Sequence, residues 1–317
     1  MQPMEGTPVV ARPIVWSRKI YTRKRLETGL ESLVVLKEPT KNAAGKQIGW
    51  FEVIARRLGQ LDLGMLNNDP MKFPPTVREV IATNSKAHEA AQDKRGVKEL
   101  FDTAKGQTCI IAGSGRSLLK DLGAIRSRDR GRTQVIAVNA AFKILGAENV
   151  DMVLAIDWSA KKDWWEGENL DNVKCILGAA CPPEMIELFK NRYYFAGTLS
   201  SAMQDGDKAW EKYGSLEQGF VASYCALHLA YKMGFKRVVF VGHDAAYTDM
   251  WYHHNEKISM ERSEYLKSSF HEDIHGKMTV TDMRMYQGMQ MLNAASILIE
   301  EDGVEVVNCS QEGIWAS

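Results

Sequence analysis

Between residues 107 and 307 the sequence alternates short β-branched runs with stretches of helical periodicity. This alternation is typical of βαβ units around a parallel sheet, and a parallel sheet must be covered on both faces. We therefore predict an α/β domain of the Rossmann-like type, with three layers and a mostly parallel sheet. Strands are expected at residues 107–112, 134–138, 152–156, 174–177, 193–195, 237–241 and 304–307. The clearest helices are expected at residues 117–127, 183–190, 218–233 and 282–301.

Residues 1–95 lack this alternation and combine a basic start, a predicted hairpin and a proline-marked passage. We predict that they form a smaller N-terminal α+β extension to the Rossmann-like domain at residues 96–317. The first 25 residues are the most basic part of the chain. Such a segment suits a solvated arm, a homo-oligomer contact, or an arm that binds anions or nucleic acid. A hairpin is expected across residues 32–54, and a helix at 76–104 with a break near Gly96.

Composition and charge narrow the class of protein. Lys and Arg together number 40, and so do Asp and Glu, which gives a formal net charge of zero. No overall excess of charge therefore indicates that the chain binds nucleic acid or a membrane surface. No apolar stretch reaches the roughly 18 residues of a membrane span, and the first residues lack the order of a signal peptide. We expect a cytoplasmic protein without a membrane span. The five cysteines contain no C-x-x-C pair and are expected to be buried reduced thiols.

A glycine-containing loop follows the first predicted strand of the sheet. Gly113-Ser114-Gly115-Arg116-Ser117 leads directly into a predicted helix. Glycines let a backbone approach a ligand closely, and unpaired amides at a helix N-terminus favour phosphate. The loop has neither the third glycine of a dinucleotide fingerprint nor the lysine of a P-loop. It therefore predicts a nucleotide or another phosphorylated ligand, with a purely structural turn as the alternative.

Polar side chains end three further strands. Asn139, Asp157 and Asp244 each follow a predicted strand, and parallel strands end at one edge of a sheet. We therefore expect them to converge near the glycine-containing loop, although each carboxylate alone could equally be a helix cap. Residues 245–255 are rich in aromatic and histidine side chains and suit an active-site lid. Within them, His253 or His254 is the expected general base, with surface or packing roles as the alternative.

One further motif has the spacing of a zinc site. His271-Glu272-Asp273-Ile274-His275 is a literal H-E-x-x-H, which on a helix would place two imidazoles on one face. Asp273 puts a charge inside the motif, and Gly276 would stop the helix directly after it. We therefore do not favour a metalloprotease.

Taken together, residues from about 107 to 312 resemble the 6-hydroxymethylpterin diphosphokinase MptE-like family. That family includes the central domain of the Maf flagellin glycosyltransferases and is similar in layout to bacterial sialyltransferases. The matching segments are residues 111–118, 138–140, 155–157, 219–222, 241–247 and 307–313. The sequence departs from the family where Arg116 replaces a common proline and Phe220 replaces a frequent second glycine.

The resemblance implies a transferase that binds a nucleotide-linked donor. We expect a glycosyltransferase with a CMP- or UDP-linked sugar donor and a hydroxyl acceptor. The acceptor stays open among a glycan, a protein, a small molecule and a modified nucleic acid. The alternatives are a diphosphokinase that transfers diphosphate from ATP to a 6-hydroxymethylpterin-like alcohol, and a non-catalytic nucleotide-binding module.

The same reasoning assigns candidate residues. The catalytic candidates are Asp157, Asp244, His253 and His254. The donor-binding candidates are Gly113, Ser114, Gly115, Arg116, Ser117, Asn139, Gly219, Tyr247 and Ser310. Asn139 and Asp157 would hold the nucleoside or a divalent metal such as Mg²⁺, but no D-x-D pair ends a strand and the metal ligands stay unknown.

Overall fold

The computed structural model describes residues 75–197, 210–219, 221–247, 251–253, 256–257 and 269–315. Its centre is an eight-stranded sheet in the order β1-β6-β5-β4-β3-β2-β9-β14, and every pairing in it is parallel. The strands are β1 (Arg95–Gly96), β2 (Thr108–Ala112), β3 (Thr133–Val138), β4 (Met152–Ala155), β5 (Lys174–Leu177), β6 (Arg192–Tyr194), β9 (Arg237–Val241) and β14 (Glu305–Asn308). The predicted Rossmann-like sheet is confirmed.

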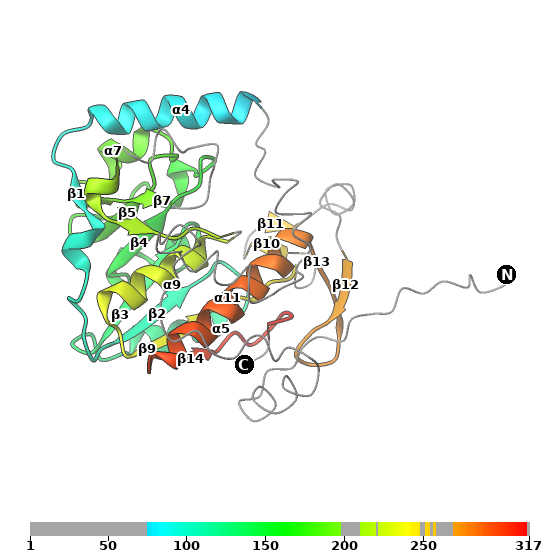
Figure 1. Cartoon of the computed structure of the whole chain (residues 1–317). Coiled ribbons are helices and arrows are strands. Elements are labelled where there is room, and N and C mark those ends of the chain that lie inside the picture. Colours follow the sequence, from blue (N-terminus) through cyan, green and yellow to red (C-terminus); the bar gives the residue numbers. More distant parts are fainter. Residues whose placement is uncertain are drawn as a thin grey trace, which may run out of the picture.

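Helices cover both faces of this sheet, which makes three layers (Figure 1). On one face lie α5 (Leu118–Arg126), α6 (Ala141–Leu145) and α7 (Glu184–Leu188). On the other lie α9 (Ala222–Met233) and α11 (Met283–Glu301). The strands supply both cores by alternation: Ile111 packs with α9 and α11, and its neighbour Ala112 packs with α5 and α6.

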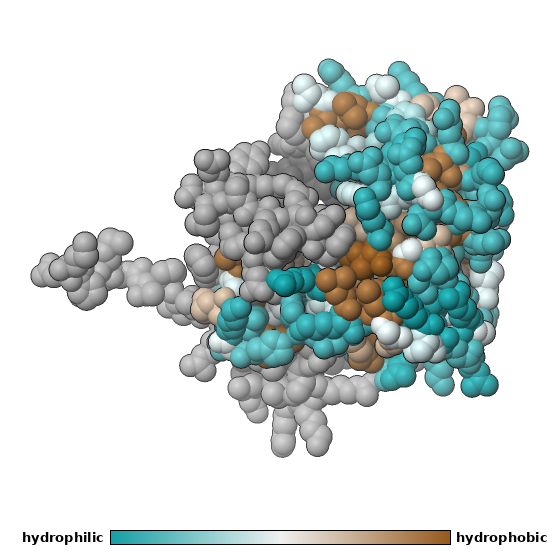
Figure 2. All heavy atoms as spheres, turned by 180° about the vertical axis from the view of Figure 1, so that it is seen from behind, coloured by the Kyte–Doolittle hydropathy of each residue, from teal (hydrophilic) through white to brown (hydrophobic). Residues whose placement is uncertain are grey.

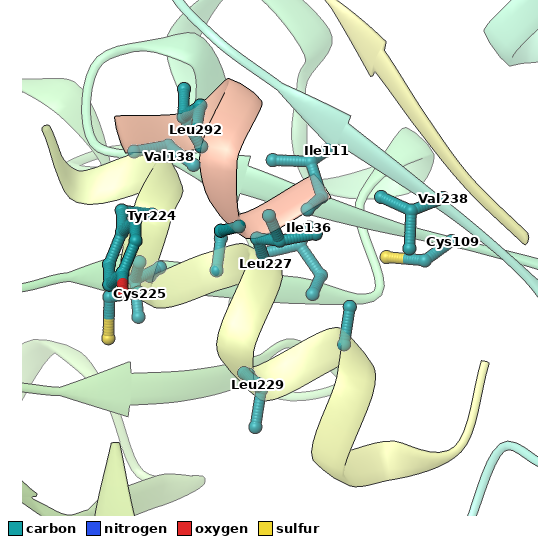
Figure 3. Packing of buried hydrophobic residues seen from close by; sticks show 14 of the residues in the cluster. Cys109, Ile111, Ile136, Val138, Tyr224, Cys225, Leu227, Leu229, Val238 and Leu292 are labelled. Carbon is teal, nitrogen blue, oxygen red and sulfur yellow. The ribbon is translucent and has the colours of Figure 1, made fainter. Parts of the chain in front are cut away.

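Helix α9 is buried on nearly all sides, because it packs between the sheet and α11. Leu227 and Leu229 of α9 lie in one apolar cluster with Ile111 and Ile136 from the sheet and Leu292 from α11 (Figure 3). Helix α9 therefore packs on the sheet with one side and on α11 with another. Because α9 is held in this way, its first turn has a fixed position at the carboxyl edge of the sheet.

The N-terminal helix ends earlier than the sequence indicated. Helix α4 covers Pro75–Ala90, and residues 95–100 form β1 and a 3-10 helix, η2 (Val97–Leu100). The expected helix across residues 91–104 is therefore wrong. The reason is tertiary: β1 pairs with β6, and a Cβ on Gly96 would lie 2.5 Å from the carbonyl oxygen of Tyr213. The chain needs extended backbone there, which local propensity does not reveal.

Helix α4 contacts the sheet through a buried histidine. The ring nitrogens of His88 lie 3.1 Å from the Tyr194 hydroxyl and 2.9 Å from the Cys181 carbonyl oxygen. The domain boundary between residues 95 and 96 stays a prediction, and Arg95 already pairs in the main sheet. The basic arm and the hairpin expected at 32–54 lie outside the described residues.

Short elements complete the described fold. The two-stranded sheets join β7 (Ala196–Gly197) with β8 (Ser215–Leu216), β10 (Trp251–His253) with β11 (Glu256–Lys257), and β12 (Ser269–Glu272) with β13 (Met278–Thr281). The remaining 3-10 helices are η3 (Ala147–Asn149), η4 (Lys162–Trp164) and η6 (Glu211–Tyr213). The H-E-x-x-H motif falls on β12 and the turn after it, so its histidines do not share a helical face.

The described surface is largely hydrophilic on the side that Figure 2 shows, with apolar residues gathered near the centre of that view. None of the helices within the described ranges is both long and apolar enough to cross a membrane. Cys109, Cys175, Cys181 and Cys225 are buried free thiols, as expected. Cys309 is exposed, because it follows the edge strand β14, and the expectation of burial was wrong for it.

Candidate functional site

A cavity lies where the order of the sheet reverses. From β2 the chain continues through β3 to β6 on one side, whereas β9 and β14 lie on the other. Open α/β sheets bind ligands beyond the carboxyl ends of the strands at such a point. The cavity there has a volume of about 140 Å³. Its walls come from residues 113–115 after β2, residues 242–246 after β9, the start of α9, part of α11, and Trp315.

The glycines of the two loops allow close backbone contact between them. The amide of Gly113 donates to the Val241 carbonyl, and the amide of Gly115 donates to the Gly242 carbonyl, both at 2.9 Å. A Cβ on either Gly113 or Gly115 would lie 2.6 Å from the Gly242 oxygen. Gly242 itself has a φ of 66°, a conformation that side chains other than glycine rarely adopt. The glycines are therefore required by the packing of one loop on the other.

Asp244 is a buried carboxylate beneath the loop after β2. Its Oδ2 accepts a hydrogen bond from the Ser117 amide at 3.1 Å, and its Oδ1 accepts one from the Ser117 hydroxyl. The backbone of Arg116 also hydrogen-bonds to it. Only 2% of Asp244 is exposed. Burial raises the pKa of Asp244 to about 6, and the nearby charge of Glu312 adds to this, while the hydrogen bonds from Ser117 oppose it.

This arrangement changes how the loop could bind an anion. The amides of Gly113, Gly115 and Ser117 donate to acceptors within the protein, and the Leu118 amide donates to the Gly115 carbonyl. The expectation of unpaired amides is therefore wrong for these four residues, because carbonyl oxygens of β9, of the loop after it and of Gly115, together with the Asp244 carboxylate, already accept their hydrogen bonds. Residues 114–116 remain only half-buried, so the tip of the loop is accessible. The assignment of residues 113–117 to donor binding stays a prediction.

His243 and Ser223 form a pair in the cavity wall that the sequence analysis missed. The Nε2 atom of His243 lies 2.7 Å from the Ser223 hydroxyl, and its Nδ1 atom lies 2.8 Å from the Val241 carbonyl oxygen. Burial lowers the pKa of His243 to about 4. Its position between Gly242 and Asp244 at a strand end was a usable signal, whereas nothing in the sequence marked Ser223. Ser310 is buried and contacts the backbone of His243, because its hydroxyl accepts a hydrogen bond from the His243 amide at 2.7 Å.

Asn139 and Asp157 lie at the same edge of the sheet but do not line the cavity. Asn139 follows β3, has a φ of 47°, and has a buried Oδ1 without a hydrogen-bond partner among the described residues. Such a conformation and an unsatisfied oxygen are typical of functional positions. Asp157 caps the turn after β4, because its Oδ1 accepts from the Ser159 amide at 2.9 Å and the Ser159 hydroxyl at 2.8 Å.

The sheet order separates the two aspartates. β4 and β9 are three strand spacings apart, or roughly 14 Å at about 4.8 Å per strand. Asp157 and Asp244 therefore share an edge without forming one catalytic pair in this structure. Their catalytic roles stay predictions.

The other predicted residues are placed as follows. Tyr247 is buried, with its amide donating to the Val280 carbonyl at 2.6 Å and its hydroxyl donating to Asp282. Gly219 allows the ring of Tyr224 to approach, since a Cβ there would lie 2.8 Å from Cγ of that ring. His253 belongs to β10, but its side chain and the whole of His254 lie outside the described residues.

The described residues contain no group of three or more His, Cys, Asp or Glu side chains that could hold a metal ion. The proposed use of Mg²⁺ therefore stays a prediction. Ligands from outside the described residues, or from a bound nucleotide, would have to complete such a site.

A family model described as 6-hydroxymethylpterin diphosphokinase MptE-like matches residues 84–250, which is more than half of the 317-residue chain. The chain belongs to the MptE-like family. The match includes both loops of the cavity and the pair formed by Ser223 and His243. No curated protein matches the chain.

A solved structure supports the fold of this MptE-like chain. The structure is the MAf glycosyltransferase from Magnetospirillum magneticum AMB-1, with a TM-score of 0.55 and 17% sequence identity. The alignment covers 76% of this chain and 38% of the glycosyltransferase, so the chain spans well under half the length of that protein. At this level of identity the similarity shows a shared fold.

Proposed function

We propose that this MptE-like chain is a transferase of the glycosyltransferase type, which takes a CMP- or UDP-linked sugar and passes the sugar to a hydroxyl acceptor. The observation that carries this proposal is the cavity between the loops after β2 and β9. It lies at the reversal point where Rossmann-like domains bind nucleotides. The similarity to a solved glycosyltransferase fold supports the choice of a sugar as the transferred group.

The donor's phosphates would meet the half-buried tip of the loop after β2. Transfer of the sugar leaves charge on the departing nucleoside phosphate, which needs a cation or hydrogen-bond donors. The guanidinium of Arg116 would supply this charge, alone or with a divalent ion. His253 or His254 would take the proton of the acceptor hydroxyl as the sugar bond forms.

Asp244 gives this site an unusual electrostatic property. A buried carboxylate next to a phosphate is unfavourable when both are charged. Because the pKa of Asp244 is already raised to about 6, donor binding would lead to uptake of a proton on this carboxyl. The site would thus bind an anionic donor more tightly as the pH falls towards 6.

The alternative is transfer of diphosphate from ATP to a pterin-like alcohol. It is favoured by the description of the matching family and uses the same cavity. A non-catalytic nucleotide-binding module is the remaining alternative. Assays of donor turnover with ATP and with nucleotide sugars separate the three, because only the first two functions consume a donor.

Thermal denaturation with CMP, UDP, their sugar conjugates and ATP tests the proposal. A ligand that binds only the native state at about 100 times its Kd adds about 2.7 kcal/mol to stability. We expect a CMP- or UDP-linked sugar to raise the melting temperature, and Arg116→Ala to weaken its binding at least tenfold through loss of a charge-assisted contact.

Arg126→Ala is the matched control, since Arg126 is an exposed arginine in the last turn of α5, the helix that follows the loop of Arg116. Binding should be unchanged in this variant. A chain whose melting temperature responds to none of these nucleotides would contradict the proposed function.

A further inference from the structure

The pairing of Ser223 with His243 has the geometry of an activated hydroxyl. The Oγ to Nε2 distance is 2.7 Å, which is within the range expected of a nucleophile and its base. Both residues line the cavity, and they come from different elements, the first turn of α9 and the loop after β9. None of the proposed donor-binding or acceptor-activating roles uses this pair.

The hydrogen bond of His243 Nδ1 determines the tautomer of the ring, and so the direction of the hydrogen bond between Nε2 and Ser223. A carbonyl oxygen can only accept, so the Nδ1 atom facing Val241 must carry hydrogen. In the neutral ring Nε2 is then the bare nitrogen, and it accepts the hydroxyl hydrogen of Ser223. Burial lowers the pKa of His243 and so favours this neutral form near pH 7. The imidazole is therefore poised to receive a proton from Ser223.

The ring is held in this orientation by its surroundings. Its plane is nearly perpendicular to those of Phe240, at a centroid distance of 4.9 Å, and Trp315, at 5.9 Å. The Val241 carbonyl takes the orienting role that a carboxylate has in a Ser-His-Asp triad. The His243 amide is fixed in turn by Ser310.

The environment of Ser223 suits negative charge that develops on oxygen. Ser223 is the second residue of the 12-residue helix α9, and the first amides of a helix have no partner within it. The positive end of the helix therefore lies beside the hydroxyl. The lining of the cavity also contains the apolar residues Met285, Met289 and Leu292 from α11. A site of about 140 Å³ with this lining has room for a small acyl or aryl group.

We propose that Ser223 is a nucleophile activated by His243, and that the cavity accepts small activated acyl groups as a second class of substrate. Ser223 Oγ attacks the carbonyl carbon of an ester, and its proton passes to His243 Nε2. The bond to the leaving oxygen breaks, and that oxygen takes the proton from His243. Water then attacks the carbonyl carbon of the acyl-Ser223 ester and gives a proton to His243 Nε2. The bond to Ser223 Oγ breaks, and His243 returns the proton to that oxygen, so that one ester and one water give one acid and one alcohol and the Ser223 hydroxyl is restored.

Phenylmethanesulfonyl fluoride is the probe for the nucleophile, because it reacts with an activated serine by forming an O–S bond and releasing fluoride and a proton. The full chain should gain the mass of one phenylmethanesulfonyl group, and peptide mapping should place it on Ser223. Ser223→Ala should not be labelled. His243→Gln should label more slowly by about 10²- to 10⁴-fold, the usual contribution of a general base. The same variants should lose hydrolysis of 4-nitrophenyl acetate.

Ser296→Ala is the control, because Ser296 is a half-buried serine of α11 whose hydroxyl donates to the Leu292 carbonyl and has no histidine partner among the described residues. It should label like the unaltered protein. Ser223→Cys provides a second readout if the alanine variant does not fold: alkylation of its thiol by iodoacetamide should slow when His243→Gln is added.

Absence of label on Ser223 in the unaltered chain would overturn the proposal, as would labelling that is insensitive to His243→Gln. Neither result would bear on nucleotide binding, which is measured without the probe. A merely structural hydrogen bond between α9 and the β9 loop predicts a lower melting temperature in both variants and no label.

Discussion

The loops after β2 and β9 are neighbours at the same edge of the sheet, but they contribute in opposite ways to the candidate site. The loop after β2 contributes backbone, and most of its described amides donate to the loop after β9. The loop after β9 contributes side chains: Asp244 lies under the first loop, and His243 faces Ser223. A glycine-containing loop at a helix start is therefore not by itself an open anion site. What it binds depends on which groups the neighbouring strand places beneath it.

The largest effect is expected where the two backbones touch. Gly242→Ala puts a Cβ 2.4 Å from the Gly113 oxygen, at a residue with a φ of 66°. We expect the free energy of unfolding to fall by more than about 3 kcal/mol, because backbone strain and a steric clash add. Chemical denaturation measures this.

Gly123→Ala in α5 is the matched control, since nothing lies within 4 Å of its Cβ. Alanine there should stabilise the helix by about 0.5 to 1 kcal/mol. If the two substitutions had equal effects, the close contact between the loops would not be a stabilising feature of the fold.

The next largest effect is the contribution of His243 to the loss of stability in acid. Its folded pKa of about 4 lies below the value of about 6.5 for an unfolded histidine. Between these values the unfolded chain binds more protons, so this residue makes stability fall as the pH falls from about 6.5 to 4. The shift corresponds to about 3 kcal/mol.

His243→Gln should remove this part of the acid sensitivity when unfolding is measured at several pH values. His228, whose pKa burial lowers to about 3, supplies a similar contribution that the variant leaves in place. Equal slopes for the variant and the unaltered protein would show that His243 is not buried in its neutral form.

Much of this comparison could be anticipated from local patterns. The β-branched runs located β2 to β6, β9 and β14 of the main sheet, because buried parallel strands are apolar along their length. Alternation with helices then placed the glycine-containing loop and Asp244 at one edge. The two-residue strand β1 was missed, because so short an element depends on its partner β6 and has no pattern of its own.

The part of the site that the sequence did not predict depends on contacts between segments that are far apart in the chain. Ser117 and Asp244 are 127 residues apart, and Ser223 reaches His243 across 20 residues and two elements. Local sequence gives no sign that a carboxylate will occupy a helix start or that a carbonyl will fix an imidazole tautomer. Tyr247 and Ser310 lie in segments that match the family, and the structure shows that both are buried and do not line the cavity. Their assignment to donor binding stays a prediction.

The most direct test of the central claim is the pH dependence of donor affinity, measured by calorimetry with the nucleotide sugar that gives the largest thermal shift. Its phosphodiester charges do not titrate in this range, so Asp244 is the group under test. With the Asp244 pKa near 6, affinity in the unaltered chain should weaken by up to about tenfold per pH unit above that value. Asp244→Asn should bind with a flat profile between pH 6 and 8. Identical profiles for the two proteins would contradict a donor site above Asp244.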